Sequence, residues 1–158
     1  MSKELAGIEL TFAKVIEEAV LLEALSSFLG INRAALWNLE WGGEVPTHVY
    51  AFVSYTLMDE VEYPLLSSLL FNQYLAAEPA FELKFAYALA QQFDCAVLIG
   101  NETGGSDDFL EVSPAGLVRW CSYEEDENGQ KNYHYWPYGP FTYQETVNRI
   151  EERAREAV

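Results

Sequence analysis

"PAFELKFAYALAQQFDCAVLI" (residues 79–99) joins the signal of a helix to the signal of a buried strand. Its first part, residues 79–93, is rich in alanine, and Phe81, Phe85 and Leu89 recur every four residues, which predicts a helix with one apolar face. The short, wholly apolar run "CAVLI" that follows is typical of a strand buried on both faces of a sheet. The stretch therefore predicts a helix packed on a sheet.

The segment after this stretch is typical of two successive β-hairpins. The runs "FLEVS" and "LVRWCSY" (within residues 109–123) flank the turn "PAG", which predicts the first hairpin. In "SYEEDENGQKNYHYW" (residues 122–136) an Asn-Gly lies between two alternating runs, the strongest short-range signal for a second hairpin. Farther on, Thr142 and Glu145 form a capping-box pattern that predicts a C-terminal helix over about residues 142–157.

The segment before the central helix combines strands with another helix. Apolar residues in positions 15–29 recur at steps of three and four, which predicts an amphipathic helix that Gly30 stops. Alternating, β-branched and aromatic residues predict strands around it. These expected strands cover residues 7–14, 34–41 and 47–58.

Residues 63–75 fit two different structures. In "EYPLLSSLLFNQYL" Leu65, Leu66, Leu69 and Leu70 match the apolar stripe of a helix, and Pro64 suits a first helical position. The same leucines suit an extended strand that pairs back on residues 47–58. With no internal repeat or linker, either version predicts one α+β domain over residues 1–158. Its sheet is mostly antiparallel, with an N-terminal, a central and a C-terminal helix.

The charge balance is the unusual term of the composition. The chain of 158 residues has 9 Lys+Arg against 25 Asp+Glu, a net charge of -16. Half of the residues are hydrophobic and 15% are aromatic, which excludes a disordered chain. Such a charge repels nucleic acid and anionic membranes and speeds encounter with cationic partners. Acidity also keeps an aromatic-rich protein soluble, which is the alternative explanation.

The sequence pattern predicts that the protein is cytoplasmic. The N-terminal run "MSKELAGIEL" lacks the basic and apolar regions of a signal peptide, and no apolar run is long enough to span a membrane. Cys95 and Cys121 lie in strand-like runs and are expected to be buried, reduced thiols.

We expect no catalytic site, metal or cofactor. His48 and His134 have no carboxylate or cysteine at a metal-ligand spacing. The loop "GNETGGSDD" lacks the Lys-Ser/Thr of a phosphate loop. A calcium loop starting at Glu124 has suitable oxygen ligands at first, but its twelfth position is Tyr135 where a glutamate is needed.

The second hairpin is the candidate partner-binding surface. Four contiguous acids at its tip lie beside large amphipathic rings, and acids at a rim raise the association rate of a basic partner. A second acidic and aromatic cluster, "LWNLEWGGE", and the acidic loop at 101–108 extend the candidate set. The alternative is that the acids only solvate an exposed ribbon and block aggregation. The candidate residues are Glu124, Glu125, Asp126, Glu127, Asp107, Asp108, Tyr133, Tyr135, Trp136 and Trp41.

At "FELKFAYALAQQFDCAVLIGNETGGSDDFLEVSPAGLVRWC" (residues 81–121) the chain resembles small immunity proteins of bacterial polymorphic-toxin systems. In those proteins a helix leads into a buried strand, an acidic loop and a hairpin that turns at a glycine. With the N-terminal strand, helix and strand, the resemblance covers about residues 7–123, and the C-terminal helix has no counterpart in it. The segment before the middle helix is extended in that pattern, so the resemblance implies a strand over residues 63–72.

The resemblance implies a non-enzymatic inhibitor that binds one cognate toxin domain in the cytoplasm of the producing cell. Many such toxins are nucleases with cationic clefts, which an acidic partner complements. The oligomeric state is left open, since an exposed ribbon edge also suits a dimer. The second hypothesis is a small enzyme or ligand-binding domain with a pocket under the 101–108 loop.

Overall fold

The computed structural model describes residues 5–41, 43–44, 49–59, 62–72, 78–100, 109–137 and 139–156. The helices are α1 (Glu18–Leu29), α2 (Phe81–Phe93) and α3 (Tyr143–Glu156), with short 3₁₀ helices η1 (Arg33–Ala35) and η2 (Leu39–Trp41). The strands are β1 (Leu5–Phe12), β2 (Leu36–Asn38), β3 (Ala51–Val53), β4 (Thr56–Leu57), β5 (Leu65–Asn72), β6 (Val97–Gly100), β7 (Phe109–Val112), β8 (Leu117–Glu125), β9 (Lys131–Tyr135) and β10 (Phe141–Thr142).

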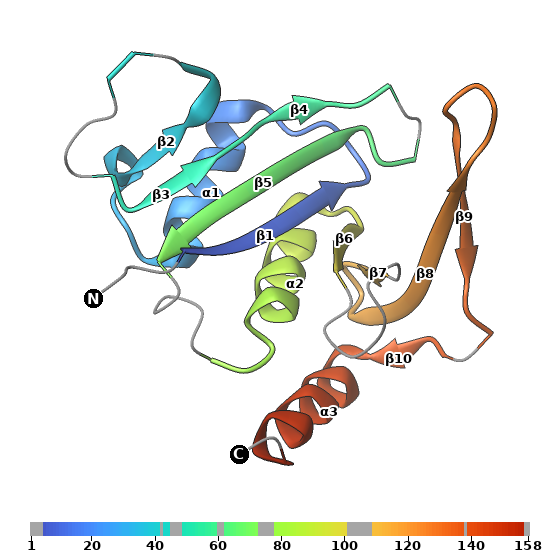
Figure 1. The fold of residues 1–158 in the computed structure, drawn as a ribbon. Coiled ribbons are helices and arrows are strands. Elements are labelled where there is room, and N and C mark those ends of the chain that lie inside the picture. Colours follow the sequence, from blue (N-terminus) through green and yellow to red (C-terminus); the bar gives the residue numbers. More distant parts are fainter. Residues whose placement is uncertain are drawn as a thin grey trace.

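These strands form one sheet in the order β10-β8-β7-β6-β1-β5-β3-β2, with β4 beside β5 and β9 beside β8. The β2–β3 pair is parallel, while pairs such as β1–β5 and β7–β8 are antiparallel. The prediction of an α+β fold with a mostly antiparallel sheet and three helices is therefore confirmed. In Figure 1 the β8–β9 hairpin rises from the sheet as a two-stranded arm, and α3 lies near the base of β8.

The core lies between one face of the sheet and the helices α1 and α2. Side chains alternate along a strand, so every second residue of β1 and of its partner β5 faces this core. The buried set on these two strands is Ile8, Leu10 and Phe12 on β1, and Leu65, Ser67, Leu69 and Phe71 on β5. On β6, Val97, Leu98 and Ile99 are all buried, which confirms a strand covered on both faces.

The three helices begin and end near their predicted positions. The N-terminal helix starts at Glu18, later than predicted from the apolar spacing, and Gly30 ends it with a φ of 70° that favours glycine. The capping box of α3 is formed as predicted. Thr142 Oγ1 accepts a hydrogen bond from the Glu145 backbone N–H (3.1 Å), and Glu145 Oε2 accepts one from the Thr142 N–H (3.2 Å).

The ambiguous segment at 63–72 contains a strand, as the resemblance implied. Over its whole length β5 pairs with β1, and it also pairs with β3 and β4 on its other side. Pairing back on residues 47–58 is therefore confirmed. The periodicity alone did not decide this, because leucines placed for a helical stripe also fill the alternate positions of a half-buried strand.

The prediction of one continuous strand over 47–58 is wrong. The described part of that segment holds two short strands, β3 and β4, and the break between them lies at Ser54. Two serine hydroxyls form hydrogen bonds with the backbone there. Ser67 Oγ donates to the Ser54 carbonyl (2.8 Å), and Ser54 Oγ accepts from the Ser68 N–H (3.0 Å). Such side-chain bonds compete with the regular ladder.

The expected strand at 34–41 is also shorter than predicted. It is β2, and the chain turns into η2 directly after Asn38. The buried side chain of Asn38 explains this end, because its Oδ1 accepts a hydrogen bond from the Glu40 N–H (2.9 Å) while its amide donates to the Glu18 carboxylate. A side chain that bonds the backbone two residues ahead favours a turn over an extended strand.

Both cysteines are thiols that form no disulfide, and both are buried, as expected. Cys121 lies on β8, whereas Cys95 lies just before β6 and outside the strand. Burial raises the pKa of the Cys95 thiol. A high thiol pKa lowers the thiolate fraction and hence the reactivity, which agrees with a packing role.

Candidate interaction surface on the β8–β9 hairpin

The predicted second hairpin is present. Strands β8 and β9 pair from Cys121 opposite Tyr135 to Glu125 opposite Lys131. Gly129 lies in the loop with a φ of 79°, the left-handed conformation that an Asn-Gly turn requires of its glycine. Asp126 closes the loop, since its Oδ1 accepts hydrogen bonds from the Asn128 and Gln130 N–H groups (2.9 Å each).

The four predicted tip acids are all exposed. Glu124, Glu125, Asp126 and Glu127 lie at the end of the ribbon, and the Glu124 side chain is 84% exposed. Lys131 lies opposite Glu125 in the ladder, and its Nζ lies 4.5 Å from the centroid of the Tyr123 ring. Asp126 differs from the other three because its carboxylate holds the turn, so it has a structural task besides its charge.

One face of the hairpin, here called the inner face, packs against the rest of the molecule. Alternation places Arg119, Cys121 and Tyr123 of β8 on this face, with Tyr133 and Tyr135 of β9. The Tyr133 ring lies 5.2 Å from the Tyr63 ring, and the Tyr123 ring stacks on Phe109 at 5.4 Å between centroids. Together with buried Leu98, these contacts form a small second core on the sheet face away from α1 and α2.

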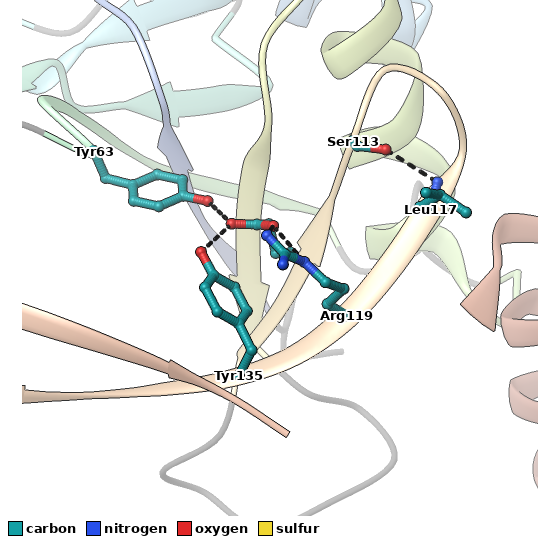
Figure 2. Close-up of polar contacts among 6 residues, drawn as sticks. Tyr63, Ser113, Leu117, Arg119 and Tyr135 are labelled. Atoms are coloured by element: carbon teal, nitrogen blue, oxygen red, sulfur yellow. Dashed lines mark hydrogen bonds and ion pairs between the residues drawn. The ribbon is translucent and has the colours of Figure 1, made fainter. Parts of the chain in front are cut away.

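A buried carboxylate, Glu111 on β7, ties this second core together. It is 7% exposed and lies directly opposite Arg119, which donates to its Oε1 from both Nη2 (2.6 Å) and Nε (3.1 Å). Its Oε2 accepts hydrogen bonds from the hydroxyls of Tyr135 (2.9 Å) and Tyr63. Figure 2 shows the two tyrosines reaching one end of the carboxylate and Arg119 reaching the other. We call Glu111, Arg119, Tyr63 and Tyr135 the Glu111 cluster.

Three members of the Glu111 cluster, Tyr63, Tyr135 and Arg119, have raised pKa values. Burial and the neighbouring Glu111 carboxylate raise the pKa of both Tyr63 and Tyr135 far above its usual value, so both hydroxyls stay protonated as donors. Burial lowers the pKa of Arg119, but the hydrogen bonds to Glu111, the charge of that carboxylate and the neighbouring tyrosines together outweigh this, and the pKa is raised. Tyr63, Tyr135 and Arg119 therefore all stay protonated at neutral pH and act as hydrogen-bond donors, which suits a structural role.

The predicted site residues do not all meet on one surface. Tyr133 and Tyr135 lie on the inner face, whereas Trp136 lies on the opposite face, here called the outer face, with its ring 5.0 Å from Trp120. Trp41 ends η2, after β2, the edge strand farthest from β8 in the strand order, and its side chain lies outside the described residues. Asp107, Asp108 and the whole 101–108 loop also lie outside them, as does His48.

Sequence reasoning missed the Glu111 cluster. The local signal was present, because Glu111 is the one charge in the otherwise apolar run "FLEVS" of a predicted strand. Its partner Tyr63 comes from the segment before β5, where Pro64 favours an extended backbone that carries the ring across the sheet. The predicted hairpin brings Arg119 near Glu111, but no signal in the sequence identifies the long-range contact with Tyr63.

Comparisons with protein-family models, with curated proteins and with solved structures found no match for this chain. Within the described residues, no group of three or more His, Cys, Asp or Glu side chains is placed to hold a metal ion. No helix in the same part of the chain combines the length and the apolar character needed to cross a membrane.

Proposed function

We propose that this chain is a non-enzymatic binding protein that neutralises a basic bacterial toxin domain, with the acidic tip of the β8–β9 hairpin as a contact surface. The resemblance to immunity proteins implies this activity, in the cytoplasm of the producing cell. The observation that carries the proposal is the exposure of Glu124, Glu125 and Glu127 on a ribbon whose base is fixed by the Glu111 cluster.

The electrostatics of the chain support this choice of partner. A net charge of -16 attracts a cationic surface at long range, and carboxylates at the end of an arm are the part that a partner meets first. A ribbon anchored at its base loses little conformational freedom on binding, which preserves affinity. Association driven in this way becomes slower as salt increases, because exposed charges are screened within about 8 Å at physiological ionic strength.

The test is protection of cells from a basic toxin domain that is identified by a pull-down with this chain from its native host. Bacteria express that domain together with the chain or with the triple variant Glu124→Lys, Glu125→Lys, Glu127→Lys. Asp126 is left in place because it closes the turn. We expect the triple variant to lose protection, with an association rate at least about tenfold slower in low salt.

The matched control is a second triple variant with the same change in net charge. Glu9 on β1, Glu23 on α1 and Glu44 after η2 are exposed acids outside the hairpin, and their replacement by lysine should retain protection. Equal loss in both variants would assign the effect to net charge, and full protection by the hairpin variant would remove the tip from the interface.

A further inference from the structure

A groove lies at the base of the hairpin, between β8 and α3. Trp120 and Phe141 line it on the sheet side, and Glu145, Arg149 and Glu152 line it on the helix side. Its volume is about 330 Å³. This lies at the lower end of the roughly 300–1,000 Å³ typical of ligand sites, so the groove suits a single side chain better than a large substrate.

The walls of the groove suit a planar cation. The ring centroids of Trp120 and Phe141 lie 6.2 Å apart at an angle of 46°, and the Trp136 ring also contacts Trp120. The molecule's own Arg149 guanidinium carbon lies 5.7 Å from the Phe141 ring centroid, which is within the range of a cation–π contact. A guanidinium stacks on aromatic faces better than an ammonium does.

The carboxylates of the groove give it the sign of charge that a cation needs. Glu145 and Glu152 outnumber Arg149, so the groove is net negative. Glu145 also accepts the capping hydrogen bond from the Thr142 N–H, which leaves exposed Glu152 as the better partner for an incoming cation. A guanidinium that lies against these rings in the groove and beside Glu152 would have both its π-face and its N–H groups satisfied.

The groove and one acid of the tip, Glu124, lie on the same face of the ribbon. Trp120 and Glu124 both belong to the outer face, because side chains alternate along β8 and its pairing with β9 continues without a break from Cys121 to Glu125. Four residues of strand separate them, a span of about 13 Å. A partner that meets the tip thus has the groove within reach of a neighbouring side chain.

We propose that this groove binds an arginine side chain of the basic partner, as a second contact beside the acidic tip. The inference rests on the proposed function for the identity of the partner. The chemistry of the groove is tested separately, with small ligands and without any toxin.

The experiment is a titration of the full ¹⁵N-labelled chain with N-acetyl-arginine amide, followed by NMR at the indole N–H of Trp120. N-acetyl-citrulline amide, which has the same length but no charge, is the control ligand. We expect a saturable shift with arginine, with a dissociation constant on the order of millimolar, and no saturable shift with citrulline. Equal shifts with both ligands, or none with arginine, would overturn the proposal.

Two variants of α3 locate the binding. Glu152→Lys should weaken arginine binding at least about tenfold, because a charge-assisted contact becomes repulsion. Glu156→Lys makes the same charge change on the same helix, at an exposed position that does not line the groove, and binding should stay within about twofold. Equal weakening in both variants would overturn the proposal, since it would reflect net charge alone.

The triple tip variant separates this inference from the proposed function. It should bind arginine amide as well as the unaltered chain does, and loss of binding would place the ligand at the tip and overturn the groove assignment. Failure of the groove in these titrations leaves the protection assay of the tip untouched. Loss of the tip's role in protection likewise leaves the measured groove affinity unchanged.

Discussion

The two faces of the β8–β9 hairpin are built from similar residues and have different surroundings. The inner face has Tyr133 and Tyr135, whose rings or hydroxyls contact Tyr63 and Glu111. The outer face has Trp120 and Trp136, which contact each other beside an open groove. Both faces are aromatic, so the difference comes from what the rest of the chain brings to each.

This difference separates the role of anchoring from the role of binding. The inner face is fixed by one buried carboxylate and its three donors, and it sets the direction in which the arm points. The outer face adjoins exposed Glu124 and the groove, so it is the face on which a partner gains contacts without displacing internal ones. Changes on the inner face should therefore cost stability, and changes on the outer face should cost binding.

Removal of the central carboxylate should give the largest effect. Glu111→Ala leaves the Tyr63 hydroxyl buried without its acceptor and Arg119 without its ion pair. Arg119 is 44% exposed and can be hydrated in part, so we expect a loss of about 3 kcal/mol in the free energy of unfolding. Urea unfolding followed by far-UV circular dichroism measures it. Glu124→Ala, at an exposed carboxylate of the same arm, is the control and should leave the midpoint unchanged.

The hydroxyls of the two tyrosines that bond Glu111 should contribute unequally to the free energy of unfolding. Tyr63 is 3% exposed, whereas Tyr135 is 38% exposed, although both donate to the same oxygen. Water can replace the Tyr135 hydroxyl but not the Tyr63 hydroxyl. We therefore expect Tyr63→Phe to cost about 2 kcal/mol and Tyr135→Phe less than about 1 kcal/mol in urea unfolding. Equal costs would mean that exposure does not distinguish the two bonds.

Alkaline pH should reveal the contribution of Tyr63 to the free energy of unfolding. An unfolded tyrosine loses its proton near pH 10, while burial and Glu111 raise the pKa of folded Tyr63 well above that value. Above about pH 10 the unfolded state binds fewer protons than the folded state, so stability falls as pH rises. This contribution is complete below pH 10 and should decrease by up to about 1.4 kcal/mol per pH unit above it. Unfolding measured from about pH 9 to about pH 11 should have a shallower slope in Tyr63→Phe.

Local sequence patterns correctly predicted those parts of the fold that are formed by residues close together in the sequence. The capping box needs only Thr142 and Glu145, and the hairpin needs only the alternation around its loop. Each of these was predicted from residues that are neighbours in the chain. The continuity of the strand at 47–58 was wrongly predicted, because its break depends on groups across the sheet. The Ser67 hydroxyl donates to the Ser54 carbonyl, and the Ser68 N–H donates to the Ser54 hydroxyl.

The division between the two hairpin faces was not predictable for the same reason. Alternation shows that Tyr135 and Trp136 point in opposite directions, but both are large aromatic residues and either could be the exposed one. Glu111 decides between them, through a hydrogen bond from Tyr135 and another from Tyr63, which precedes Glu111 by 48 positions. Such a contact depends on topology and leaves no periodic trace in the sequence.

The smallest expected effect separates structure from charge within the tip itself. Asp126→Ala removes the acceptor of the Asn128 and Gln130 N–H groups and should cost about 1 kcal/mol in urea unfolding, while Asp126→Asn keeps the side-chain oxygen and should retain most of that stability. Glu127→Ala removes the same charge from the adjacent position and should leave stability unchanged. If Asp126→Asn and Asp126→Ala were equally destabilised, the charge would matter more than the turn bonds.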